Sequence, residues 1–92
     1  MTTSLNESFH FLLADDHTIV RQGIEMILEE INEENQIKHA SSLQQIIQNL
    51  QTYSFDFAIL DAQMQDGNCL SILPEIKKTQ PDLKVMMFTS FI

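Results

Sequence analysis

The chain alternates short apolar segments with longer segments of helical periodicity, and this alternation limits its fold more than any other feature. Four apolar segments are predicted as strands, over residues 9–14, 36–41, 55–60 and 83–88. Between them, apolar residues recur every three or four positions, which predicts helices over residues 17–31, 43–50 and 70–79. The resulting βαβαβαβ order implies a parallel sheet with right-handed crossover connections.

Individual residues indicate where these elements begin and what lies inside. Ser42 is expected to cap the second helix, and Thr18 or Asp16 the first. Pro74 is expected either in the first turn of the third helix or at a kink within it. The residues expected to face the core in the C-terminal half are Leu70, Leu73, Ile76, Met86 and Met87.

Composition and charge exclude several classes of function. Thirteen acidic residues stand against five basic ones, a net charge of -8. A nucleic-acid-binding surface carries clustered cations, and here only Lys77-Lys78 is clustered. No apolar run reaches the roughly 18 residues of a membrane-spanning helix. The single cysteine, Cys69, cannot form an internal disulfide, so we expect a cytoplasmic protein. From the charge and the short apolar runs, we expect no direct contact of this segment with nucleic acid or membrane.

Polar side chains follow three of the predicted strands. Asp15-Asp16 follows the first strand, Asp61 the third and Thr89 the fourth. The carboxyl ends of parallel strands share one edge, where open α/β sheets bind ligands, so these side chains should meet. A single aspartate at a strand end is more often a turn former or helix cap, and Thr89 could simply cap a following helix. The combination on one edge nevertheless favours a site.

Clustered carboxylates have a characteristic chemistry. They repel one another, which raises pKa values or recruits a cation, and oxygen ligands suit Mg²⁺. A carboxylate beside such an ion can act as a nucleophile and form an acyl phosphate. The three histidines lie on separate elements without ligand spacing, so a histidine metal site is not expected, and His17 is expected only to flank the acidic pair.

Several stretches of this sequence resemble a known family. Leu12-Leu13-Ala14-Asp15-Asp16-His17, followed by Val20-Arg21-Gln22-Gly23, resembles the opening of receiver domains of NarL/FixJ (LuxR-type) response regulators. The segment from Asp61 to Asn68 resembles that family's phosphorylation loop, and Pro81–Val85 and the strand ending at Thr89 also match. Gln65 stands where the family usually has proline, so the loop after Asp61 is expected to be less rigid. Cys69 stands where a glycine is usual, so a strained turn is expected before the third helix.

The resemblance implies a fold and a domain organisation. The fold is a three-layer, doubly wound, flavodoxin-like or CheY-like α/β sheet of strand order 2-1-3-4, with the family's fifth strand absent. Residues 1–8 would be a tail and residues 9–92 a partial receiver domain. The lysine on the family's fifth strand and the DNA-binding output region would lie beyond this sequence. The fourth strand would then be an open edge, and we expect a homodimer through it.

The resemblance also implies roles for individual residues. Asp61 would accept a phosphoryl group from a histidine kinase in a two-component system. Asp15, Asp16 and Asp61 would hold Mg²⁺, together with the main-chain carbonyl of Gln63. Thr89 would contact the phosphate and transmit the change.

Two other functions remain open at this stage. The chain could be a receiver-like interaction or dimerisation module that is not phosphorylated. It could also be a Mg²⁺-dependent phosphohydrolase, which is disfavoured because Gln63 stands where such enzymes place a second catalytic aspartate. We therefore expect a phosphoacceptor switch that regulates transcription through another domain, not a turnover enzyme.

Overall fold

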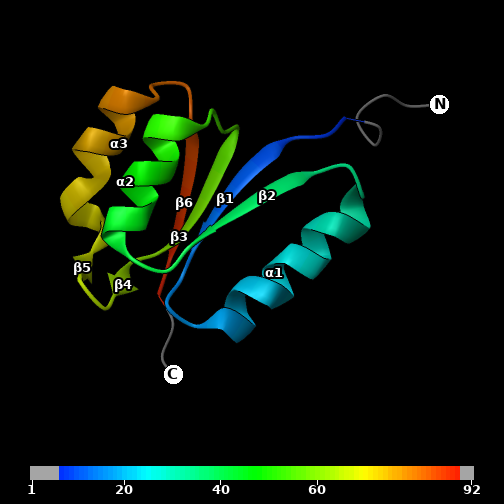
Figure 1. Ribbon diagram of the computed structural model, residues 1–92, viewed down its shortest axis with the longest axis horizontal. Helices are drawn as coiled ribbons and strands as arrows, with labels where there is room; N and C mark the ends of the chain where they lie inside the picture. Colours follow the sequence, from blue (N-terminus) through cyan, green and yellow to red (C-terminus); the bar gives the residue numbers. More distant parts are fainter. Residues whose placement is uncertain (1–6, 90–92) are drawn as a thin grey trace.

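The computed structural model describes residues 7–89 and confirms the predicted α/β class (Figure 1). The main sheet contains β1 (His10–Ala14), β2 (Gln36–Ala40), β3 (Phe57–Asp61) and β6 (Lys84–Phe88). The α-helices that connect them are α1 (Thr18–Ile31), α2 (Leu43–Thr52) and α3 (Leu73–Thr79). Within this main sheet every strand pair is parallel, in the order β2-β1-β3-β6, which confirms the predicted order 2-1-3-4. Most of the predicted tail, residues 1–6, lies outside the described residues.

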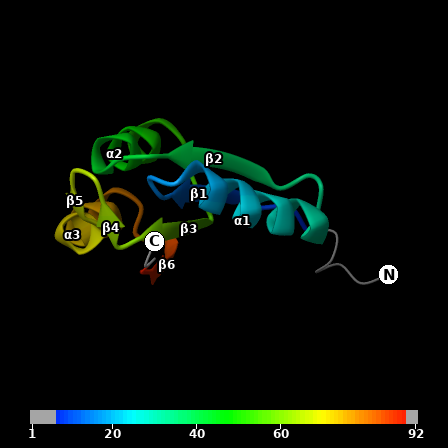
Figure 2. The ribbon, with the colours of Figure 1, turned by 90° about the horizontal axis from the view of Figure 1, so that it is seen from below.

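The sheet has a separate apolar core on each face. Successive side chains of a strand point to opposite faces, and β1 is apolar on both. Phe11 and Leu13 pack with Leu28 of α1, whereas Leu12 and Ala14 pack with residues of α2 and α3. Figure 1 and Figure 2 show α2 and α3 side by side, apart from α1. The layers are therefore α1, sheet and α2/α3, which confirms the three-layer prediction.

The helix starts agree only in part with the predicted caps. Ser42 precedes α2, and its side chain accepts a hydrogen bond from the Gln45 backbone N–H, as predicted. The N-cap of α1 is His17, which makes no side-chain cap bond, so the prediction of Thr18 or Asp16 is wrong. The side chain of Asp15 instead accepts a hydrogen bond from the His17 backbone N–H. The side-chain acceptor at this end of the helix is therefore Asp15, which comes before both predicted residues in the sequence.

The segment between β3 and α3 is more ordered than the predicted turn. β4 (Gln63–Met64) and β5 (Gly67–Asn68) form a small antiparallel hairpin. A 3-10 turn, η2 (Cys69–Ile72), then leads into α3, where Pro74 lies in the first turn and needs no N–H partner. Cys69 is fully buried, and no non-glycine residue among 7–89 has a positive φ. The expected strain at Cys69 is therefore absent.

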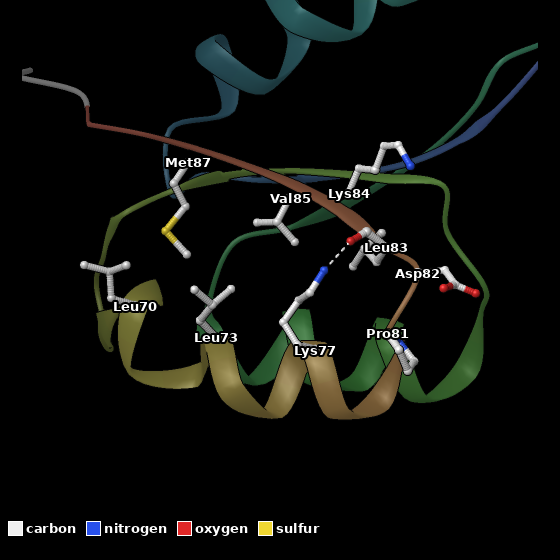
Figure 3. Close-up of a pocket in the computed structure, with 9 residues that line it drawn as sticks. All are labelled: Leu70, Leu73, Lys77, Pro81, Asp82, Leu83, Lys84, Val85 and Met87. Atoms are coloured by element: carbon white, nitrogen blue, oxygen red, sulfur yellow. Dashed lines mark hydrogen bonds between the residues drawn. The ribbon is translucent and has the colours of Figure 1, made fainter.

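Several apolar side chains expected inside lie on the surface. Leu70 is 58% exposed and Met86 63%, so their assignment to the core is wrong, whereas Ile76 is fully buried. Strand β6 is an edge of the described sheet, and a groove of about 960 Å³ separates it from α3 (Figure 3). Leu70, Leu73, Val85 and Met87 line this groove. Lys77 crosses it from α3 and donates a hydrogen bond to the Leu83 carbonyl.

Candidate metal and phosphoacceptor site

The ends of the two central strands bring buried carboxylates together. Asp15 follows β1, and Asp61 is the last residue of β3; each is 1% exposed. Because β1 and β3 pair in parallel with Ala14 opposite Leu60, these aspartates stand at the same level of the sheet. One ligand atom from each of Asp15, Asp16, His17 and Asp61 lies within 4.8 Å of the others. The predicted convergence of three carboxylates is therefore confirmed.

Asp15 has one satisfied and one unsatisfied carboxylate oxygen. Its Oδ1 accepts the backbone N–H of His17 at 2.7 Å and contacts the ring Nδ1 of His17 at 2.8 Å. Its Oδ2 is buried and has no hydrogen-bond partner among the described residues. A buried carboxylate oxygen without a donor is costly, and a cation would satisfy it.

His17 belongs to this cluster, which the sequence did not predict. Its Nδ1 lies 3.0 Å from Asp16 Oδ1 as well as 2.8 Å from Asp15 Oδ1. The hydrogen bond with Asp15 raises the pKa of His17, with further contributions from the charges of Asp16, Asp15 and Asp61. The only sequence signal was the position of His17 directly after the acidic pair.

Asp61 is held from its own loop. The backbone N–H of Gln63 donates to Asp61 Oδ1 at 3.1 Å, and the backbone N–H of Ala62 donates to the Phe88 carbonyl at 2.7 Å. Gln63 begins the hairpin and is exposed. Gln63, whose main-chain carbonyl was expected to bind the cation, therefore lies beside Asp61 and is bonded to it through its backbone N–H.

Thr89 is near the site by register but is not one of the clustered groups. Phe88 pairs with Asp61, so Thr89 stands one residue beyond the level of that carboxylate. Its side chain is exposed. A role for its hydroxyl stays a prediction.

The donor set fits a hard divalent cation. Asp15, Asp16 and Asp61 supply carboxylate oxygens from two neighbouring strand ends, and Asp15 Oδ2 is buried without a hydrogen-bond partner among the described residues. Mg²⁺ prefers oxygen ligands, so this set of carboxylates suits it. The imidazole of His17 adds a nitrogen that is now engaged with the carboxylates.

A comparison with protein families decides what kind of domain this is. The family model for the response regulator receiver domain matches residues 11–92. This chain belongs to the response regulator receiver family. The receiver domain is similar to a DNA-binding transcriptional activator, DevR/DosR of Mycobacterium tuberculosis (strain ATCC 25618 / H37Rv), at 29% identity over 79 residues. It is 32% identical over 81 residues to the response regulator protein VraR of Staphylococcus aureus (strain Mu3 / ATCC 700698).

The receiver domain corresponds to only part of these relatives. The matches cover 86% and 88% of this chain but 36% of DevR/DosR and 39% of VraR. The chain therefore spans well under half the length of the curated relatives it matches.

Solved structures agree on the fold of this receiver domain. RcsB from Salmonella enterica serovar Typhimurium, bound to promoter rprA with phosphomimetic BeF3-, has a TM-score of 0.79 at 26% identity, over 90% of this chain and 48% of that one. A CheY-like receiver protein from Methanospirillum hungatei JF-1 has a TM-score of 0.83 at 22% identity, over 94% and 67%. The second likeness establishes a CheY-like fold.

No helix in the part of the chain that the structure describes is long and apolar enough to cross a bilayer.

Proposed function

We propose that this receiver domain is a phosphoacceptor switch of a two-component system, with Asp61 receiving a phosphoryl group from a histidine kinase. The observation that carries the proposal is the convergence of Asp15, Asp16 and Asp61 within 4.8 Å at one edge of the sheet. Asp61 is buried but lies at a strand end, and its Oδ1 is oriented by the Gln63 amide. Such a carboxylate is held in place as a nucleophile should be.

Phosphoryl transfer requires Asp61 to attack the phosphorus of the donor. A P–O bond to a carboxylate oxygen forms while the P–N bond to the kinase histidine breaks, and the leaving imidazole takes up a proton. Asp15, Asp16, Asp61 and the Gln63 main-chain carbonyl would hold Mg²⁺, which neutralises charge on the phosphoryl oxygens when bound. Thr89, one residue past the register partner of Asp61, would donate its hydroxyl to the phosphate.

The output of the switch is proposed to be control of transcription by another domain. DevR/DosR is a DNA-binding transcriptional activator, and the matched RcsB structure contains a promoter. This chain carries a net charge of -8, which disfavours direct DNA contact by the receiver segment itself. We therefore infer a cytoplasmic switch that partners a kinase and is phosphorylated and dephosphorylated without turning over a separate substrate.

The direct test is covalent phosphorylation of Asp61. The protein is incubated with acetyl phosphate or phosphoramidate and Mg²⁺, and its intact mass is measured. A phosphate-sized gain is expected in the wild type and in the control Asp82→Asn, an exposed aspartate outside the cluster, but not in Asp61→Asn. No gain in the wild type, or an equal gain in Asp61→Asn, contradicts the proposal.

A second candidate function is association through β6, with or without phosphorylation. Within residues 7–89, β6 pairs only with β3, and Met86 on this edge strand is 63% exposed. An apolar, unpaired strand edge is a template for pairing with another chain. We infer that a second copy occupies this edge and covers the groove beside it (Figure 3).

Light scattering or sedimentation tests this association. A dimer is expected for the wild type, weakened by Met86→Glu because a charge would be buried at the new interface. Ile31→Glu is the matched control, since Ile31 is similarly exposed at 61% but lies on α1. A wild type that stays monomeric at high concentration rejects the second candidate.

A further inference from the structure

A chain of hydrogen bonds runs from the acidic site into the interface between α1 and β2. Arg21 on α1 donates from Nη1 to the backbone carbonyl of Asp15 and from Nε to Nδ1 of His39 on β2, the latter at 3.1 Å. The other ring nitrogen of His39, Nε2, lies 2.8 Å from Glu25 Oε1. Four residues, from α1, β2 and the loop after β1, thus form one connected path, Glu25–His39–Arg21–Asp15.

These contacts assign hydrogen-bond roles to the two ring nitrogens of His39. The guanidinium Nε–H can only donate, so Nδ1 of His39 must accept and carry no proton. Nε2 then carries the proton and donates to the Glu25 carboxylate. His39 therefore connects an arginine to a glutamate and fixes the direction of the guanidinium.

The path ends at the backbone of Asp15, the buried carboxylate residue of the acidic site. The Asp15 amide is bonded to the Ala40 carbonyl at 3.1 Å, so β2 holds one side of this residue. Arg21 holds its carbonyl, which begins the turn carrying Asp16 and His17. Hydrogen bonds at both its amide and its carbonyl therefore fix the backbone of Asp15, and with it the position of the carboxylate.

We propose that Arg21 is a positioning residue for the cation site, with His39 and Glu25 keeping its guanidinium on the Asp15 carbonyl. Residues beyond the direct ligands that orient a metal site commonly change its affinity by about 10–100-fold when removed. The inference rests on the proposed cation site but does not depend on phosphorylation of Asp61.

The sign of the effect of Arg21→Met on Mg²⁺ affinity separates positioning from simple electrostatics. Loss of a positive charge beside carboxylates would by itself tighten Mg²⁺ binding. Loss of positioning weakens it, and we expect the Mg²⁺ dissociation constant to rise about tenfold. Affinity is read from the Mg²⁺-induced shifts of the Asp16 and His17 amides by NMR, and folding is checked by the thermal midpoint.

Matched variants complete the test. Lys78→Met removes the same charge from exposed α3 and should bind Mg²⁺ no more weakly than the wild type. Arg21→Lys keeps the charge but cannot bond Asp15 and His39 together, so it should fall between the wild type and Arg21→Met. His39→Ala leaves the charge of Arg21 in place and should also weaken Mg²⁺ binding. In the double variant it should add little to the effect of Arg21→Met, because both substitutions interrupt the same path.

Each result decides the matter. Unchanged or tighter Mg²⁺ binding in Arg21→Met overturns the inference; if that variant does not fold, the same outcome in Arg21→Lys and His39→Ala does so. A wild type that binds Mg²⁺ at the cluster without accepting phosphate rejects the proposed phosphoacceptor function and leaves this inference standing. A wild type that binds no Mg²⁺ rejects both the cation site and the role of Arg21.

Discussion

Asp15 Oδ1 lies 2.7 Å from the backbone nitrogen and 2.8 Å from the ring Nδ1 of His17, so one carboxylate oxygen accepts from two groups of the same residue. The backbone contact shapes the turn between β1 and α1. The ring contact places a titratable group against three carboxylates. The same pair of residues therefore orders the loop and places an imidazole against the carboxylates of the site.

The first prediction concerns the pH dependence of stability due to His17. Because its folded-state pKa is raised, mainly by the bond to Asp15, His17 contributes stability that is fully present below its unfolded pKa of 6.5 and is lost as pH rises through the folded value. The loss of urea stability in His17→Ala should therefore be larger at about pH 5.5 than at about pH 8.5. His10→Ala, exposed at the far end of β1, is the control. An equal loss at both pH values would argue against the ring contact.

The second prediction concerns the buried thiol. Burial, then the charges of Asp61 and Asp66, raises the pKa of Cys69 from 9.0 to about 11. The thiol should react with alkylating reagents at neutral pH far more slowly in the folded protein than in urea. The exposed variant Ser54→Cys should gain one fast-reacting thiol. The raised pKa also means that stability is lost as pH rises between 9.0 and about 11.

The third prediction compares two apolar residues of the same region. Ile76 is fully buried in α3, whereas Leu70 is 58% exposed in η2. Ile76→Ala should lower the free energy of unfolding by about 2–5 kcal/mol because it leaves a cavity. Leu70→Ala should change it by less than about 0.5 kcal/mol. Urea denaturation of the two variants measures the difference, and similar losses would place Leu70 in the core after all.

The fourth prediction compares the two glycines. Gly67 has φ +143°, and a Cβ there would lie 2.9 Å from Leu43 Cδ1. Gly67→Ala should therefore destabilise the protein by about 1–3 kcal/mol, from backbone strain and the close contact. Gly23 in α1 has open space around it, so Gly23→Ala should stabilise by about 0.5–1 kcal/mol. Thermal unfolding should show shifts of opposite sign.

The sequence predicted the main elements well because their signals are local. Strands that are apolar on both faces and helices with three- and four-residue spacing are visible without any partner. Boundaries were less accurate at the third helix, where Cys69–Ile72 forms a 3-10 turn before α3. Periodicity does not distinguish a 3-10 start from an α-helix, and it could not show that Leu70 faces outward.

By itself, the sequence predicted the α/β class and the meeting of Asp15, Asp16 and Asp61 at one edge, because parallel strands place their carboxyl ends together. The strand order was predicted only from the resemblance to receiver domains. Only the tertiary structure decided which side chains complete the site. The contacts of His17 with the acidic pair and the path through Arg21 and His39 depend on side-chain directions and on packing between α1 and β2. Such contacts join residues up to 18 positions apart and leave no periodic trace in the chain.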